Sequence, residues 1–140
     1  MLSSPLSIAS GAVVATGGAI NVANDAGVFM LAFNGADVPR KYDGTTWGTS
    51  VISATVGSIS MTGAVIINAM MHKRRIFLQE KESLRVWYLP VNAIGGAAAS
   101  LDMTSLCQFG GFLMAMGTWT LDAGYGVDDY AVFITSQGEV

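Results

Sequence analysis

Three aspartates near the carboxyl end of the chain have the residue type and spacing to attract a metal ion. Asp122, Asp128 and Asp129 flank a loop that contains glycine, and carboxylate and carbonyl oxygens are the ligands that calcium prefers. Their spacing fits neither an EF-hand nor the nonapeptide calcium repeat. Because Asp and Gly also satisfy the backbone geometry of turns, we interpret the segment as a polar loop. An enzyme that uses these carboxylates is the weaker alternative, which chelation and the Asp128→Ala variant would test.

The single histidine and the single cysteine limit the other chemistry. His72 alone cannot build the usual multi-histidine metal sites, and Cys107 alone excludes an internal disulfide and a CxxC zinc site. Nucleophilic catalysis needs a base beside the attacking group, but His72 is followed directly by Lys73–Arg75, a run that predicts a solvated basic face. We expect Cys107 to be a buried thiol. The sequence therefore predicts no enzyme, no catalytic or cofactor-binding residue, no metal and no cofactor.

Phosphate binding has little support in the sequence. No GxxxxGK[ST] motif occurs, and the pairs Gly17-Gly18 and Gly95-Gly96 lack the GxGxxG spacing. The basic cluster His72–Arg75 has two interpretations: it contacts phosphates, or it pairs with Glu80, Glu82 or acidic groups of a neighbouring subunit. Seven Lys plus Arg against ten Asp plus Glu give a net charge of −3. No general attraction to nucleic acid is indicated.

The elements that position these residues are built from an unusually apolar chain. Its 140 residues suffice for one core, so we take residues 1–140 as a single β-rich domain. Apolar residues make up 51% of the chain and charged residues 12%, about half the charged fraction of a typical soluble domain. Seventeen glycines, with many Ala, Ser and Thr, favour turns over a helical bundle. The sequence predicts an all-β fold of antiparallel hairpins.

Hairpin signals begin in the first third of the chain. The apolar run Val28–Phe33 is closed by Asn34-Gly35, a dipeptide that tolerates positive φ and makes tight turns. The segment Tyr42–Trp47 places two aromatic rings on either side of an Asp-Gly turn, where they can meet across a hairpin. Residues 1–27 are expected to be an irregular N-terminal segment. They begin without the basic region of a signal peptide, so secretion is not supported.

Four later runs are typical of strands, and a connection lies between the second and the third. The runs are Arg74–Gln79, Leu84–Leu89, Phe112–Thr120 and Tyr130–Thr135. The charged stretch Glu80–Ser83 predicts a solvated loop between the first two. In the connection, Gly95-Gly96 and three alanines are expected to hold a short helical turn capped by Ser100 or Asp102.

The last residues predict a hairpin that needs a partner. Ser136–Glu139 has the composition of a turn, and Val140 follows it as the last residue. Tyr130–Thr135 is too apolar to stand exposed, and a two-stranded ribbon alone is only marginally stable. We therefore expect a largely buried strand there, with the strand after the turn supplied from outside residues 1–140. Another chain would fill it, or the polypeptide is a piece of a longer one.

A membrane-spanning helix is the competing interpretation of the middle of the chain. Val51–Met71 contains no charged residue and precedes the basic cluster, as in a span with a positive-inside anchor. Eight of its 21 residues are Ser, Thr, Gly or Asn, however, and Ser58, Ser60 and Thr62 alternate with apolar residues. The alternative function is a small, holin-like phage membrane protein that spans at residues 51–71.

Three blocks carry a resemblance to a known family: FNGADVPRKYDGTTW (Phe33–Trp47), HKRRIFLQEKESLRVWYLPVNAIGGAAASLD (His72–Asp102) and GGFLMAMGTWTLDAGYGVDDYAVFITSQGEV (Gly110–Val140). From about Val28 onward the chain resembles the tail nozzle or hub proteins of short-tailed, podovirus-like bacteriophages, which have a β-propeller body. The successive hairpins also resemble propeller blades, which usually take about 40–50 residues. Members of the family are usually several times longer and continue past the SQGEV turn, so this chain is expected to be a partial propeller.

The resemblance implies a structural role in the virion. It implies a ring, sixfold in the family, around the conduit through which DNA leaves the head. The partners would be copies of the chain and other phage tail or portal-adaptor proteins, with passive contact to DNA and no small-molecule substrate. The protein would be assembled in the bacterial cytoplasm and reside in the virion tail. The family has no catalytic motif to transfer to this sequence.

Overall fold

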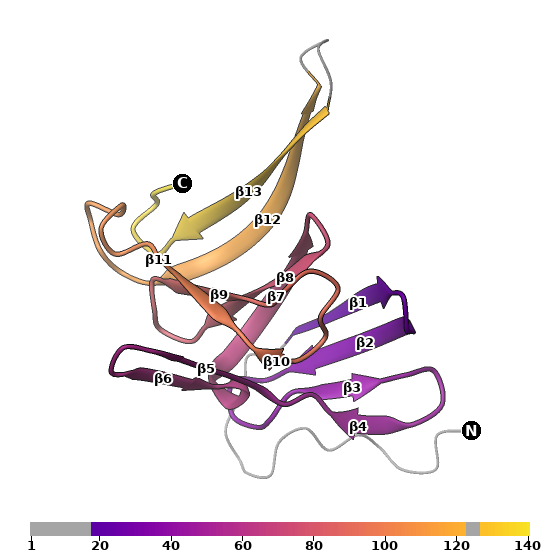
Figure 1. Ribbon diagram of the computed structural model, residues 1–140. Helices are drawn as coiled ribbons and strands as arrows, with labels where there is room; N and C mark the ends of the chain where they lie inside the picture. Colours follow the sequence, from indigo (N-terminus) through magenta and orange to yellow (C-terminus); the bar gives the residue numbers. More distant parts are fainter. Residues whose placement is uncertain (1–17, 123–126) are drawn as a thin grey trace.

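The fold consists of strands joined by turns and loops (Figure 1). The computed structural model describes residues 18–122 and 127–140. Within these ranges there is no α-helix, and the one helical element is a short 3-10 turn, η1 (Gly63–Val65). The expectation of an all-β protein with antiparallel sheets is therefore confirmed.

The described strands form four sheets, which are antiparallel except for one parallel pair. The first has the order β1 (Gly18–Asn24), β2 (Gly27–Phe33), β3 (Arg40–Tyr42), β4 (Trp47–Thr49). The second has the order β10 (Gly96–Ala97), β5 (Ile52–Val56), β6 (Ile59–Thr62), with β10 parallel to β5. The third has the order β11 (Ala99–Asp102), β9 (Arg85–Tyr88), β8 (Arg75–Glu80), β7 (Ile66–His72). The fourth is the ribbon of β12 (Leu113–Asp122) and β13 (Val127–Thr135).

The β3–β4 hairpin forms where the sequence predicts it. Tyr42 lies directly opposite Trp47, and their ring centroids are 4.9 Å apart. Oδ1 of Asp43 accepts hydrogen bonds from the backbone N–H groups of Thr45 at 2.8 Å and Thr46 at 2.7 Å. Gly44 adopts a φ of +96°, which a residue with a side chain rarely adopts. The turn residues and the aromatic pair therefore fix this hairpin together.

The N-terminal region is more regular than the sequence suggests. Strand β1 occupies part of residues 1–27 and pairs with β2 along its whole length, so the expectation of an irregular segment is wrong from Gly18 onward. Residues 1–17 lie outside the described part. Asn34-Gly35 is not a tight hairpin turn either: Oδ1 of Asn34 accepts from the N–H groups of Ala36 and Asp37 and shapes a longer connection to β3. The Asn34 side chain accepts these hydrogen bonds from the residues that follow it, and the connection is therefore longer than a two-residue turn.

The segment Val51–Met71 is not a helix. It forms β5, β6, η1 and most of β7, with a turn at Gly57, where φ is +61°. Its alternation explains this, because Ile52, Ala54 and Met61 are buried while the serines and threonines between them are exposed. In the described ranges, no helix has the length and apolar character needed to cross a membrane.

The glycine- and alanine-rich connection is also extended rather than helical. Gly96 donates its N–H to the carbonyl of Val51 at 2.7 Å, and Ala98 donates to the carbonyl of Ser53 at 2.9 Å. The chain then continues as β11, in which Ser100 lies opposite Trp87. The prediction of a helical turn is wrong. Residues 96–102 hydrogen-bond instead to the edges of β5 and β9, so their backbone groups are not paired within a helix. This crossing joins the second sheet to the third.

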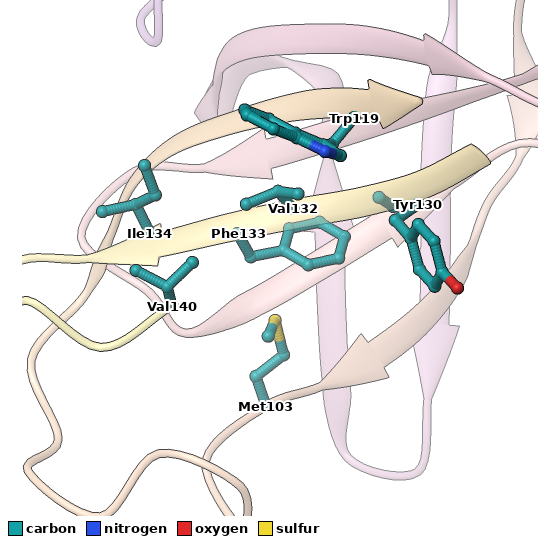
Figure 2. A pocket seen from close by; sticks show the side chains of 8 residues that line it. Met103, Trp119, Tyr130, Val132, Phe133, Ile134 and Val140 are labelled. Carbon is teal, nitrogen blue, oxygen red and sulfur yellow. The ribbon is translucent and has the colours of Figure 1, made fainter. Parts of the chain in front are cut away.

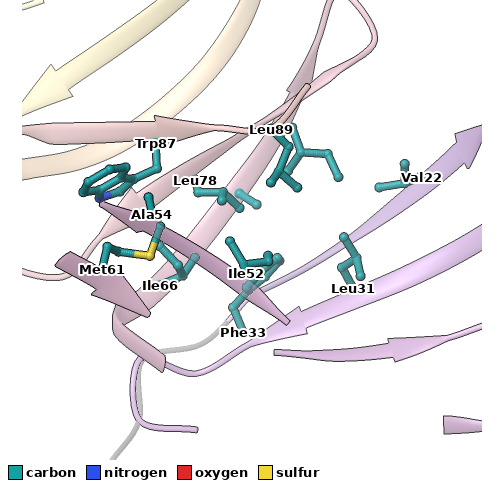
Figure 3. Packing of buried hydrophobic residues seen from close by; sticks show 12 residues of the cluster. Val22, Leu31, Phe33, Ile52, Ala54, Met61, Ile66, Leu78, Trp87 and Leu89 are labelled. Atoms are coloured by element: carbon teal, nitrogen blue, oxygen red, sulfur yellow. The ribbon is translucent and has the colours of Figure 1, made fainter. Parts of the chain in front are cut away.

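The core lies between the first three sheets (Figure 3). Its largest member is Trp87 on β9, whose side chain is fully buried. The indole Nε1 donates to Oε2 of Glu80 at 2.8 Å, which satisfies its only polar atom. The buried apolar residues packed with it are Val22, Leu31, Phe33, Ile52, Ala54, Met61, Ile66, Ala69, Ile76, Leu78 and Leu89. Strands β8 and β9 hold the centre of the core, which confirms the strands predicted there.

Candidate functional site

The β12–β13 ribbon lies with one face against the third sheet (Figure 1). On this inner face the Phe133 ring is 6.3 Å, centroid to centroid, from the ring of Phe77 on β8. Thr118 donates its hydroxyl to the carbonyl of Met71 on β7 at 3.3 Å. Both predicted strands are confirmed, and each extends further toward the loop between them than its apolar run. We call the first three sheets the body. Its third sheet supports the ribbon from one side.

The outer face of the ribbon is apolar and exposed. Trp119 lies directly opposite Tyr130, and their side chains are 64% and 51% exposed. Val132 and Ile134 follow Tyr130 on the same face because strand side chains alternate. The expectation that Tyr130–Thr135 is largely buried is therefore wrong for the single chain, in which only Thr135 of that run is buried. Strands β12 and β13 are apolar on both faces, but only one face of the ribbon lies against the third sheet. The other face is therefore left uncovered.

A groove of about 650 Å³ runs beside β13 (Figure 2). Figure 2 shows Met103 rising toward it from the segment after β11, with the aromatic and aliphatic side chains of the ribbon opposite. The residues that line it are mostly apolar and include Met103, Trp119, Tyr130, Val132, Ile134 and Val140. Among the described strands β13 pairs with β12 alone, so no other described strand pairs with its second edge. The groove thus combines an apolar wall with a strand edge that no other described strand pairs.

The base of the ribbon is fixed by a buried amide. Gln79 on β8 is buried, and its Nε2 donates to the carbonyl of Leu113 at 2.6 Å. The N–H of Leu113 donates to the carbonyl of Ser83 at 2.9 Å, and its side chain is buried as well. Sequence reasoning missed Gln79. The signal that could have found it is a polar residue at a core-facing position of an apolar strand, since a buried amide needs partners.

The predicted turn after β13 forms and leads the chain back along the open edge. Gly138, with a φ of +82°, donates its N–H to the carbonyl of Thr135 at 3.1 Å. The N–H of Thr135 donates to the carbonyl of Glu139 at 2.9 Å, which is the first rung of an antiparallel pair. The Glu139 carboxylate accepts from the N–H groups of Gln108 at 2.7 Å and Phe109 at 3.2 Å. These contacts hold Val140 at the end of the groove.

The three candidate aspartates lie at the far end of the ribbon. Asp128 is exposed, and Oδ1 of Asp129 accepts from the Thr120 hydroxyl at 2.7 Å. The Asp122 side chain and residues 123–126 lie outside the described part. Among the residues that are described, no cluster of three or more His, Cys, Asp or Glu side chains could hold a metal ion.

The basic cluster is divided by the β7–β8 turn. His72 is buried, contrary to a fully solvated run, and its ring meets Phe77 edge-on with centroids 6.0 Å apart. Lys73 and Arg74 are exposed and form the turn with φ angles of 47° and 62°. Arg74 Nε donates to Oδ1 of Asn92 at 3.2 Å. His72 is buried because side chains alternate along β7, which places the His72 side chain on the same face of the sheet as Phe77.

Other predicted contacts of these charged groups differ as well. Neither Glu80 nor Glu82 pairs with the basic cluster, and in the described ranges the one ion pair joins Arg85 and Asp102 at 3.2 Å. The Thr104 hydroxyl and N–H, followed by the Arg85 guanidinium, lower the pKa of Asp102 to about 2.

Cys107 is only half-buried, because it lies in the loop before β12 rather than in the core.

The described geometry combines an exposed apolar face, an apolar groove and a strand edge that no other described strand pairs. An exposed apolar face and an open strand edge can take up an extended segment, with backbone groups supplying hydrogen bonds and side chains filling the groove. The sequence signal for this surface is a pair of long strands that are apolar on both faces.

No family model, curated protein or solved structure matches this chain.

Proposed function

We propose that the protein is a structural component of a bacteriophage virion tail, of the nozzle or hub type, and that it assembles with copies of itself. The exposed outer face of the β12–β13 ribbon is the observation that carries this proposal. Contiguous apolar surface of this kind, on a chain with few charges, is normally covered by a partner. The protein acts by packing, with no substrate and no turnover.

The resemblance to phage tail proteins supplies the biological setting of the proposal. Its three blocks correspond to the segment from the end of β2 to the start of β4, to strands β8 to β11, and to the ribbon with its turn. In the proposed assembly these hairpins are parts of β-propeller blades in a ring around the DNA exit conduit. The neighbours are copies of the chain and other tail or portal-adaptor proteins.

Contact with DNA in such a conduit would be passive. Lys73 and Arg74 are exposed, but the chain carries a net charge of −3. Strong phosphate contacts would hold a duplex that must slide during ejection. We expect duplex DNA to show no saturable binding in fluorescence anisotropy at physiological salt.

Light scattering coupled to size exclusion tests the proposal directly. We expect the purified chain to form a discrete oligomer, and negative-stain images to show rings with a central channel. Trp119→Lys should shift the chain to monomer because it places a charge in the apolar face. Val28→Lys is the matched control, since Val28 is also an exposed apolar strand residue, at 67% exposure, but lies on the first sheet. A parent chain that stays monomeric at high concentration would contradict the proposal.

A further inference from the structure

We infer that the acidic far end of the β12–β13 ribbon docks at the basic β7–β8 turn of a neighbouring copy, where Asp128 meets Lys73 and Arg74. The inference rests on the proposed self-assembly and names the surface of the neighbour that covers the outer face of the ribbon. It is carried by the opposite charges of the two regions and by the way in which each region presents them.

Charges are unevenly distributed along the chain. Three of the seven Lys and Arg residues are consecutive, Lys73–Arg75, and lie at the β7–β8 turn. From Val86 to Val140 the sequence has no Lys or Arg, and the far end of the ribbon carries Asp122, Asp128 and Asp129. Opposite charges favour contact between these two regions of different copies, and like charges disfavour contact between two identical regions. The charge pattern therefore favours a head-to-tail contact.

The β7–β8 turn holds its cations in defined positions. Lys73 and Arg74 are exposed and have φ angles of 47° and 62°, a conformation that Asn-Gly usually supplies in two-residue turns. The Arg74 Nε donates to Oδ1 of Asn92 at 3.2 Å, which orients the guanidinium and leaves its two terminal nitrogens for a carboxylate. The turn therefore presents two cations to a partner.

A cavity of about 680 Å³ adjoins this turn at Arg75. Among the described residues that line the cavity, Arg75 alone is charged, and its guanidinium carbon lies 5.8 Å from the centroid of the Tyr88 ring. The other lining residues are Pro90, Val91 and residues 97–99, which are alanines. Such a cavity fits a partner that offers apolar side chains next to a carboxylate.

The far end of the ribbon has this combination of groups. Asp128 is exposed and lies opposite Leu121, which is 49% exposed. Because strand side chains alternate, both lie on the outer face that carries Trp119 and Tyr130. A neighbour that covers this apolar face therefore meets the Asp128 carboxylate at its end.

The other nine acidic residues are less suited to this contact. Six of them accept hydrogen bonds within their own chain: Asp37, Asp43, Glu80, Asp102, Asp129 and Glu139. Glu82 directly follows a lysine, which balances its charge. Asp25 lies in the β1–β2 turn, whose asparagine donates to the Asn92 carbonyl at 2.9 Å, so it is beside the basic turn of its own copy. The Asp122 side chain lies outside the described part, which leaves Asp128.

The two regions do not pair within one copy. In the described ranges the one ion pair joins Arg85 and Asp102, and Figure 1 shows the far end of the ribbon projecting beyond the body. A contact between different surfaces of identical chains is heterologous, and its repetition closes into a ring when the rotation between copies allows closure. The contact is thus compatible with the ring of the proposed function.

Charge reversal separates this contact from general effects of charge. Lys73→Glu and Asp128→Lys should each raise the dissociation constant of the assembly about tenfold, because each places like charges together. The double variant Lys73→Glu/Asp128→Lys should recover most of this loss, because it restores an opposite pair with the signs exchanged. Lys81→Glu and Glu82→Lys are the matched controls, since they make the same charge changes at exposed positions of the β8–β9 turn. Sedimentation velocity measures the association, and circular dichroism checks that each variant is folded.

A pair of cysteines tests the contact without reversing charges. In a Cys107→Ser background, chains with Lys73→Cys mixed with chains with Asp128→Cys should form a disulfide-linked heterodimer under mild oxidation. Chains with Lys81→Cys mixed with the same Asp128→Cys chains should not.

The outcomes distinguish the inference from the proposed function. If the parent chain assembles and both single charge variants assemble equally well, the neighbour covers the ribbon with another surface; the inference is then wrong, while the proposed function stands. A double variant that recovers nothing, with cysteine chains that do not cross-link, would also overturn the inference. So would saturable binding of duplex DNA that Lys73→Glu abolishes, since the turn would then hold phosphates. If the parent chain is monomeric, both proposals fail.

Discussion

The body and the ribbon use similar apolar residues for different purposes. In the body, short strands from three sheets enclose Trp87, and its side chain has no exposed surface. The ribbon has the two longest strands of the described chain, yet its tryptophan, Trp119, is 64% exposed. A long apolar strand is therefore no guide to burial in this protein. What decides burial is whether sheets cover both faces of the strand.

Alanine substitution of the two tryptophans should give the largest contrast. Trp87→Ala is expected to lower the free energy of unfolding by about 3–5 kcal/mol, because it leaves a cavity in the core. Trp119→Ala should change it by no more than about 0.5 kcal/mol at concentrations where the chain is monomeric. Urea unfolding followed by circular dichroism measures both. Equal losses would show that the ribbon belongs to the cooperative core.

Gln79→Met should loosen the connection between the two regions. The variant keeps the side-chain volume but removes the donor to the Leu113 carbonyl. Leaving that carbonyl without its partner costs about 1–3 kcal/mol, and removal of the buried Gln79 Oε1, which has no hydrogen-bond partner, offsets part of this cost. Hydrogen exchange should become faster in β12 and β13 and stay unchanged in β8 and β9. Uniformly faster exchange would instead indicate that Gln79 supports the core.

A smaller effect is expected from Gly111→Ala at the base of the ribbon. Gly111 has a φ of +90°, and a Cβ there would collide with Oγ of Ser136 and approach Cγ of Gln137 to 3.0 Å. We expect a loss of about 1 kcal/mol in stability from this strain. Gly117→Ala is the matched control, because Gly117 lies on β12 with open space where its Cβ would be. Thermal unfolding that fails to separate the two variants would contradict the assignment.

The smallest effect should come from pH and be confined to the body. The pKa of Asp102 is lowered from 3.8 to about 2 in the folded chain. Its ionised form therefore stabilises the fold above about pH 4, and this contribution is lost as the pH falls toward 2. Asp102→Asn should remove that part of the pH dependence. Carboxyl chemical shifts in an NMR titration give the folded pKa, and an ordinary value would refute the contacts with Thr104 and Arg85.

The features that could be predicted from the sequence are those set by residues close together in the chain. The Asp43-Gly44 turn and the β-favouring runs of β8 and β9 are local features, so they were visible in the sequence. The conformation of residues 96–102 was not, because it depends on the edges of β5 and β9.

The candidate surface was predicted only in part. The strand Tyr130–Thr135 and the turn after it follow from composition, whereas its need for a partner stays a prediction. The exposure of Tyr130 and the role of Gln79 could not be derived, since both depend on which face of the ribbon meets the third sheet.

The order of the strands also bears on how fast the chain folds. Strands β1 to β4, β5 with β6, β7 to β9, and β12 with β13 each pair with a neighbour in sequence. Such pairs close short loops, and β-hairpins form in about 1–10 μs. The parallel pairing of Gly96 with Ile52 and the packing of the ribbon on β7 and β8 join distant segments. We therefore expect rapid hairpin formation followed by one slow phase, in which the crossing closes the core.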